Sequence, residues 1–173
     1  MKKVLKERLQ MENEKTHFGF ESVNKNLKAK KVKSVFESVA TRYDLMNSLM
    51  SAGLHKIWKK YFTQILSLKN NSKILDLASG TGDLCIELSN QNKNFKIFHT
   101  DINIKMLEQG KIKLIDQGKI IPSIVCDAEK IPFPSNYFDC ITIAFGLRNV
   151  TNKEEALSEM YRVLSPGGKL VIL

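Results

Sequence analysis

A short apolar run that ends in a glycine-rich turn constrains the fold of this chain more than any other feature. The sequence ILDLASGTGDL at residues 74–84 predicts a buried strand, a tight turn through Gly80 and Gly82, and a helix that opens at Asp83. This order of elements lets backbone N–H groups approach a ligand closely. Asp101 ends the next apolar run, about 20 residues downstream, where a carboxylate can bond ribose hydroxyls. The pattern therefore predicts a nucleotide-binding unit.

The acidic residues of this unit bear on the kind of nucleotide. A dinucleotide fingerprint, G-x-G-x-x-G, has a third glycine where this chain has Cys85. Asp76 lies in the first strand, four residues before Gly80, and a carboxylate there suits a ligand with positive charge. S-adenosylmethionine carries an ammonium and a sulfonium group, so we expect it, not NAD, to bind and to pair with Asp76. The alternative is a glycine turn without such a ligand, and the acids at 76 and 101 argue against it.

Strands and helices alternate along the rest of the chain. We expect strands at 73–78, 95–100, 121–126, 138–145 and 168–173, and helices at 82–91, 103–117 and 152–164. Pro166, Gly167 and Gly168 predict a break between the last helix and the last strand. The alternation predicts an α/β fold with a largely parallel sheet, helices on both faces and a ligand at the carboxyl ends of the strands. The chain stops inside an apolar strand, which indicates a truncated sheet.

Two amphipathic segments precede the first strand. The first apolar stripe holds Val32, Val35, Phe36, Val39, Tyr43 and Met46, and the second holds Leu54, Ile57, Trp58, Tyr61, Phe62, Ile65 and Leu66. Both follow helical spacing, so we expect two helices that pack mostly on the core and cap the ligand cleft. The predicted organisation is a polar, basic and irregular segment at 1–28, capping helices at 29–72 and a nucleotide-binding core at 73–173.

The net charge of +9 is concentrated in the N-terminal part of the chain. Residues 1–33 hold ten basic and four acidic residues, whereas the remaining 140 hold seventeen and fourteen. This excess is compatible with weak attraction to an anionic membrane surface or with a solvated, partly disordered tail. Because no basic patch is interleaved with aromatic residues, we expect no nucleic-acid partner.

The cysteines and histidines do not have the spacing of metal ligands. They are Cys85, Cys126, Cys140, His17, His55 and His99. The three cysteines are far apart in apolar contexts, which is typical of reduced core cysteines in an intracellular protein. We therefore expect no metal. No run of 18 apolar residues is present, so we expect no membrane-spanning helix.

Longer motifs resemble those of the ubiquinone/menaquinone biosynthesis C-methyltransferases, which are class I S-adenosylmethionine-dependent methyltransferases. The matching motifs are VFESVATRYDLMN at 35–47, GLHKIW at 53–58, LDLASGTGDL at 75–84, DAEKIPFP at 127–134, FDCITIAFGLRNV at 138–150 and YRVLSPGG at 161–168. The glycine motif alone indicates a methyltransferase, whereas YDLMN and FGLRNV are more specific to quinone biosynthesis. The resemblance implies a Rossmann-like sheet whose last two strands are missing from this chain.

The resemblance also implies cofactor contacts at Thr81, Asp101, Asp127 and Ala128. Thr81 lies between the glycines and would face the methionine half of the cofactor. Asp127 would accept a hydrogen bond from the adenine amino group, and the Ala128 backbone N–H would donate to a ring nitrogen. The alternative role for Asp127 is to cap a turn.

The implied reaction transfers a methyl group from sulfur to a ring carbon of a polyprenyl quinol. The products would be menaquinol from demethylmenaquinol, a methylated 2-polyprenyl-6-methoxy-1,4-benzoquinol, or both. Ionising a ring hydroxyl makes the adjacent carbon nucleophilic, and we expect Arg148 to favour that state by its charge. Asn149 would orient the quinol oxygen or a water, and Tyr43 would position the substrate or transfer a proton. The alternatives are a salt bridge for Arg148 and core packing for Tyr43.

A prenyl tail lies in the bilayer, so the resemblance implies a cytoplasmic protein peripheral to the inner membrane. It would meet its substrate at the membrane surface, directly or through a quinone-synthesis complex, and it could be an oligomer. The lysines at 56, 59 and 60 could contribute, although a solvated helix face explains them too. Two other functions stay open. One is methylation of another small lipid-like acceptor, and the other is a truncated, inactive fragment that binds cofactor or a partner.

Overall fold

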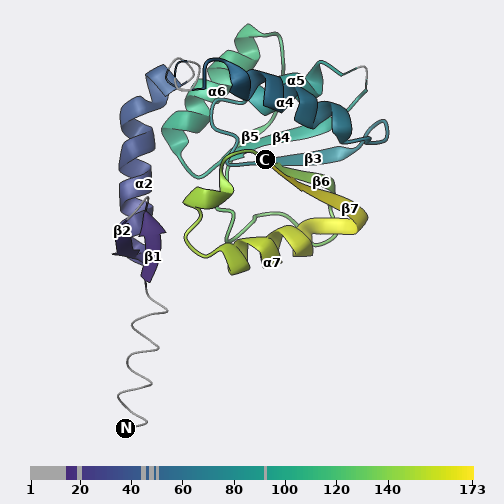
Figure 1. The fold of residues 1–173 in the computed structure, drawn as a ribbon. Coiled ribbons are helices and arrows are strands. Elements are labelled where there is room, and N and C mark those ends of the chain that lie inside the picture. The colour runs from purple at the N-terminus through teal and green to yellow at the C-terminus, as the bar shows by residue number, and fades with distance from the viewer. Residues whose placement is uncertain (1–14, 19–20, 44–45, 47–48, 50, 92) are drawn as a thin grey trace.

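Five parallel strands form the central sheet of the computed structural model (Figure 1). The structure describes residues 15–18, 21–43, 46, 49, 51–91 and 93–173. The strands are β3 (Lys73–Leu77), β4 (Lys96–Asp101), β5 (Ser123–Val125), β6 (Phe138–Ile143) and β7 (Leu164–Ile172). Their order across the sheet is β5-β4-β3-β6-β7, and all neighbouring pairs are parallel. The predicted α/β sheet is confirmed, and β3, which carries the glycine turn, lies at its centre.

Helices cover both faces of this sheet, as Figure 1 shows. The elements are α4 (Leu54–Ile65), α5 (Asp83–Ser89) and α6 (Ile104–Asp116) on one face and α7 (Lys153–Val163) on the other. Parallel strands need such crossover connections, which leave both faces of the sheet covered. The near-continuous burial along β3 and β6 follows from that double cover.

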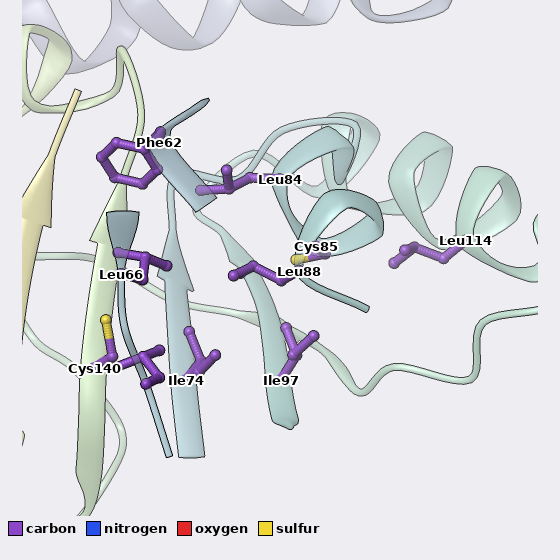
Figure 2. Packing of buried hydrophobic residues seen from close by; sticks show 10 residues of the cluster. Phe62, Leu66, Ile74, Leu84, Cys85, Leu88, Ile97, Leu114 and Cys140 are labelled. Carbon is purple, nitrogen blue, oxygen red and sulfur yellow. The ribbon is translucent and has the colours of Figure 1, made fainter. Parts of the chain in front are cut away.

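Each face of the sheet has its own apolar core. On the α4–α5 face, Ile74 and Cys140 pack in one cluster with Phe62, Leu66 and Leu88 (Figure 2). On the α7 face, fully buried side chains of the strands pack in one cluster with those of α7. The strand residues are Leu75, Ile141 and Ile143, and the helix residues are Ala156, Met160 and Val163. Burying a large apolar side chain stabilises a fold by about 1.5–3 kcal/mol. The three cysteines are free and buried, as their apolar contexts predicted.

The last strand begins earlier than the sequence suggested. β7 starts at Leu164, directly after α7, and the predicted break at 166–168 is a bulge within the strand. The register passes from Phe138 opposite Leu164 to Cys140 opposite Lys169, so five steps on β7 match two on β6. Gly167 makes this possible with a φ of +79°, a conformation that a side chain disfavours.

The N-terminal segment is more ordered than predicted. β1 (Lys15–Phe18) and β2 (Glu21–Asn24) pair antiparallel, and α2 (Lys25–Val39) follows directly. The prediction of an irregular segment up to residue 28 is therefore wrong for residues 15–18 and 21–28, and the expected boundary at 28/29 falls inside α2. The short 3-10 helix η1 (Ala40–Arg42) continues from α2. Residues 1–14 lie outside the described part of the chain.

The apolar stripe of α4 is only partly buried, which corrects the prediction that it faces the core. Phe62 and Leu66 are 3% exposed. Five other large side chains of α4 are between 46% and 65% exposed: Leu54, Ile57, Trp58, Tyr61 and Ile65. Trp58 also lies beside Phe145, with 6.3 Å between the ring centroids. Among the described residues, none of the helices has both the length and the apolar character needed to cross a membrane.

Candidate functional site

The glycine turn after β3 is held by the last three residues of β4. The Ser79 backbone N–H and hydroxyl both donate to the Thr100 carbonyl, each at 2.9 Å. The Gly80 N–H donates to Asp101 Oδ2 at 2.9 Å, and His99 Nε2 lies 3.0 Å from the Gly80 carbonyl oxygen. These contacts follow from the parallel register, which sets Asp76 opposite His99. The turn is therefore fixed by the neighbouring strand.

His99 supports the turn through its ring, which contacts the Gly80 carbonyl, a role that the sequence did not reveal. A carbonyl only accepts hydrogen bonds, so Nε2 carries the proton, and Nδ1 accepts from the Ser123 hydroxyl at 2.9 Å. Burial lowers the pKa of His99, against the opposing effect of the Gly80 carbonyl. Gly110 of α6 leaves room for this arrangement, since a Cβ there would lie 2.5 Å from His99 Cε1 and 2.7 Å from the Gly80 oxygen.

Asp101 lies where the sequence placed it, at the carboxyl end of β4. Its Oδ2 accepts from the Gly80 N–H, and its Oδ1 accepts from the Asn103 N–H at 2.8 Å. Burial raises the pKa of Asp101, while the backbone N–H groups of Asn103, Gly80 and Ile102 oppose that rise. Each carboxylate oxygen can accept a further hydrogen bond. Asp101 is therefore oriented and retains capacity for two adjacent hydroxyls.

Asp76 lies deeper than predicted. It is 1% exposed, and its Oδ1 accepts from the Thr142 hydroxyl at 2.7 Å. Its Oδ2 accepts from Cys85 Sγ at 3.3 Å. Burial raises the pKa of Asp76 to about 7, against the opposing hydrogen bonds. The carboxylate is enclosed by β3, β6 and α5, beneath the turn, and its pairing with a ligand stays a prediction.

The other turn residues lie above Asp76. Thr81 is 6% exposed. Gly80 and Gly82 have φ of +56° and +78°, and Gly82 caps the N-terminus of α5. Tyr43 approaches this turn from the capping segment: a Cβ on Gly80 would lie 3.9 Å from Tyr43 Cε1. The half-buried Tyr43 ring also contacts Phe36, at 5.8 Å between centroids, so packing contributes to its position.

Asp127 and Ala128 follow the carboxyl end of β5. Asp127 is exposed, and its Oδ1 accepts from the Glu129 N–H at 2.9 Å. The turn-capping alternative therefore describes part of what Asp127 does. A hollow of about 650 Å³ adjoins Asp127 on the α7 side, where Glu155, Glu159 and Arg162 also line it. Neither the glycine turn nor Asp101 lines that hollow, so it is separate from the nucleotide turn.

Arg148 and Asn149 lie on a short 3-10 helix, η2 (Leu147–Asn149), after the carboxyl end of β6. Gly146 brings this helix against the glycine turn, because a Cβ there would lie 2.6 Å from the Ala78 Cβ. Arg148 is exposed. No described acidic side chain forms an ion pair with it, so the salt-bridge alternative finds no support in this part of the chain.

One of the three lysines of α4 is not free for a membrane contact. Lys59 Nζ lies 2.8 Å from Asp83 Oδ2, and Lys113 pairs with the other oxygen of the same carboxylate. Although burial opposes ionisation, the two ammonium groups lower the pKa of Asp83 to about 2. Lys60 remains exposed, and the Lys56 side chain lies outside the description. Within the described chain, no cluster of histidine, cysteine, aspartate or glutamate could hold a metal ion.

Apart from Tyr43, the candidate residues thus lie at or just after the carboxyl ends of four adjacent parallel strands, β3 to β6. A central β3 with a glycine turn, and an acid ending β4, define a Rossmann-like domain of the methyltransferase type. Solved structures agree. A SAM-dependent methyltransferase from Aquifex aeolicus is 26% identical, with a TM-score of 0.61 over 66% of this chain and 62% of that one. A putative methyltransferase from Bacillus halodurans is 28% identical, with a TM-score of 0.61 over 66% of this chain and 49% of that one.

The chain belongs to the ubiE/COQ5 methyltransferase family, whose model matches residues 24–173. Two curated relatives, from Burkholderia orbicola and Burkholderia cenocepacia, are named ubiquinone/menaquinone biosynthesis C-methyltransferase UbiE. Each is 54% identical over 160 residues, which is 92% of this chain and 66% of the relative. The chain therefore spans just under two thirds of the length of these relatives, and the resemblance seen in its motifs is confirmed.

The substitution Asp76→Asn should change how folding stability depends on pH. The folded chain keeps a proton on Asp76 up to a pKa of about 7, whereas an unfolded aspartate releases it near a pKa of about 3.9. The Asp76 contribution is therefore greatest below about pH 4 and is lost as the pH rises to 7. Urea denaturation should show the variant gaining about 2 kcal/mol relative to the native chain between pH 5 and 7.

The matched control is Asp116→Asn, which changes an exposed carboxylate at the end of α6. Its stability should follow that of the native chain at every pH. The titrations of His99 and Asp101 are common to all three proteins and cancel in the comparison. Parallel curves for Asp76→Asn and the native chain would contradict the proposed burial of a protonated carboxyl group.

Proposed function

We propose that this chain binds S-adenosylmethionine at the glycine turn and uses it to methylate a ring carbon of a polyprenyl quinol. The observation that carries the proposal is the turn at 79–82, which β4 holds beside an oriented Asp101 carboxylate. Membership of the ubiE/COQ5 methyltransferase family supports the reaction class. The names of the Burkholderia relatives support a quinol acceptor, either demethylmenaquinol or 2-polyprenyl-6-methoxy-1,4-benzoquinol.

In this proposal, the turn and the ends of the strands bind different parts of the cofactor. Asp101 accepts from the ribose hydroxyls, and Gly80, Thr81 and Gly82 face the methionine half through their backbone. The segment after β5 holds the adenine, with Asp127 accepting from its amino group and Ala128 donating from its backbone. Asp76 pairs with the positive charge of the ligand from beneath the turn, and a cationic ligand there favours its ionised form.

The chain's own residues then have two tasks in the reaction. S-adenosylmethionine supplies an activated methyl group, so the protein must align the acceptor and make its ring carbon nucleophilic. Alignment can contribute up to about 7–11 kcal/mol to lowering the barrier. Arg148 favours the ionised ring hydroxyl by its charge, Asn149 orients the oxygen or a water, and Tyr43 positions the ring near the turn. Arg148 is exposed and without an acidic partner among the described residues, which leaves its charge available.

The acceptor's prenyl tail places the reaction at a membrane surface. The exposed apolar face of α4, from Leu54 to Ile65, carries Trp58 and Tyr61, residue types that favour membrane interfaces. Lys60 on the same helix is exposed and adds positive charge toward anionic lipids. We therefore propose that this face contacts the membrane, and that contact through a quinone-synthesis complex is the alternative.

Calorimetric titration tests the cofactor. S-adenosylmethionine should bind the native chain saturably, and Asp101→Asn should weaken binding by at least about tenfold, because a charged hydrogen-bond acceptor to two hydroxyls is lost. Asp116→Asn is the control and should bind like the native chain. Absence of binding to the folded native chain would refute the proposed site.

Turnover with a short-chain demethylmenaquinol tests the chemistry. Arg148→Ala should lower kcat by about 10²–10³, as expected for removal of one electrostatic stabiliser, and leave the cofactor Kd unchanged. Lys111→Ala, an exposed cation on α6, is the control. Near-normal turnover in Arg148→Ala would remove Arg148 from the mechanism. Cofactor binding without turnover in the native chain would favour the alternative of an inactive fragment. Turnover of other lipid-like acceptors alone would favour the alternative of a methyltransferase for another small acceptor.

Vesicle co-sedimentation tests the membrane face. The native chain should sediment with phosphatidylglycerol-containing vesicles, and the double substitution of Ile57 and Tyr61 by Ser should release most of it, because these side chains are 62% and 65% exposed. Ile120→Ser is the control, since Ile120 is 99% exposed but is not part of α4. Equal sedimentation of all three proteins would contradict a contact through α4.

A further inference from the structure

A lysine of α2 is buried against the loop that carries Arg148. Lys28 is 2% exposed, although lysine side chains almost never bury fully unless paired. Its Nζ donates to the Val150 carbonyl at 2.9 Å and to the Arg148 carbonyl at 3.3 Å. Burial lowers the pKa of Lys28, and the nearby Lys153 lowers it further, while Glu129 raises it. The ammonium is thus placed to bind backbone oxygens on both sides of Asn149.

A carboxylate holds the same loop from the other side. Glu129 Oε1 accepts from the Thr151 N–H at 2.9 Å and from the Asn152 N–H at 2.8 Å. Four backbone groups between residues 148 and 152 are therefore bound by one cation and one anion. Hydrogen bonds with a charged partner are stronger than neutral ones, so these contacts order the loop well.

The two side chains come from distant parts of the chain. Lys28 precedes its acceptor on Arg148 by 120 residues and lies on the N-terminal helix. Glu129 follows Asp127 and Ala128, the segment assigned to adenine, and its backbone N–H is bound by the Asp127 carboxylate. The loop with Arg148 is thus connected both to the capping helix and to the adenine side of the site.

We propose that Lys28 and Glu129 are positioning residues, which together clamp the backbone of residues 148–152 and so aim Arg148 at the acceptor. The inference rests on the proposed function in that Arg148 acts on the quinol. The clamp itself is a statement about the loop and can be tested without turnover. A different role for Lys28, attaching the N-terminal hairpin to the domain, predicts loss of order in α2 alone.

The test uses Lys28→Met, Glu129→Ala and the double variant in the complete chain. Lys30→Met and Glu108→Gln are controls, because both residues are exposed on helices of the same fold. Hydrogen exchange reports on the loop through the Asn149 and Val150 amides, which donate within η2. We expect exchange at 147–152 to accelerate at least tenfold in each single variant, with β3 and β4 unchanged, and the controls to match the native chain.

Kinetic measurements then distinguish a role in positioning Arg148 from a role in attaching the N-terminal hairpin to the domain. Each single variant should lower kcat about tenfold and leave KM for the quinol within about twofold of the native value. In Lys28→Met, the Kd for the cofactor should also stay within about twofold of the native value. The fold decrease in kcat of the double variant should be smaller than the product of the two single decreases, because both side chains act on one loop. The conservative variants Lys28→Arg and Glu129→Gln keep two donors and an acceptor, respectively, so they should recover part of the loss in kcat. They also replace the other variants in the test if the larger changes prevent folding.

The outcomes are distinguishable. Unchanged exchange at 147–152 in the folded variants overturns the clamp, as does faster exchange confined to α2. Accelerated loop exchange with native kcat overturns the positioning role. If the native chain binds S-adenosylmethionine but shows no turnover, the proposed function fails, while the exchange data still decide whether the clamp exists.

Discussion

The site depends on one constraint, the attachment of the turn after β3 to the end of β4. His99, Thr100 and Asp101 each contact the turn at Ser79 or Gly80, and the parallel register brings them level with it. The backbone of the turn is therefore held by contacts within the chain. Gly110 shows how tight this is, since any side chain there would meet both His99 and the turn.

Buried ionisable side chains join separate elements elsewhere in the fold. Lys28, with two carbonyl partners, and Asp76, with Thr142 and Cys85, are both almost fully buried and both satisfied. An unpaired buried charge would be very costly, so each of these groups requires its partners to stay in place. The rigid sheet and the loops beyond it are joined through such groups.

The sequence predicted most of the sheet and the position of the glycine turn beside Asp101 because both follow local rules. Apolar periodicity gave the strands and helices, and the glycine pattern located the turn with Asp101 beside it. Lys28 was not found, since its partners lie 120 residues or more away and a lysine in a basic segment resembles a solvated one. The exposure of Tyr61 and the depth of Asp76 were missed for a related reason: periodicity defines a face, but not what covers it.

The proposed reaction must also dispose of a proton. A C–C bond forms, the C–S bond breaks, and the ring carbon then loses its hydrogen. The nearby ionisable groups are poorly suited to take it: both nitrogens of His99 are engaged, Asp76 is enclosed, and both oxygens of Asp101 accept backbone N–H groups. In the proposed pathway, the ring hydroxyl is ionised beside Arg148 and the protons leave through water, so that orienting Arg148 matters more than supplying a base.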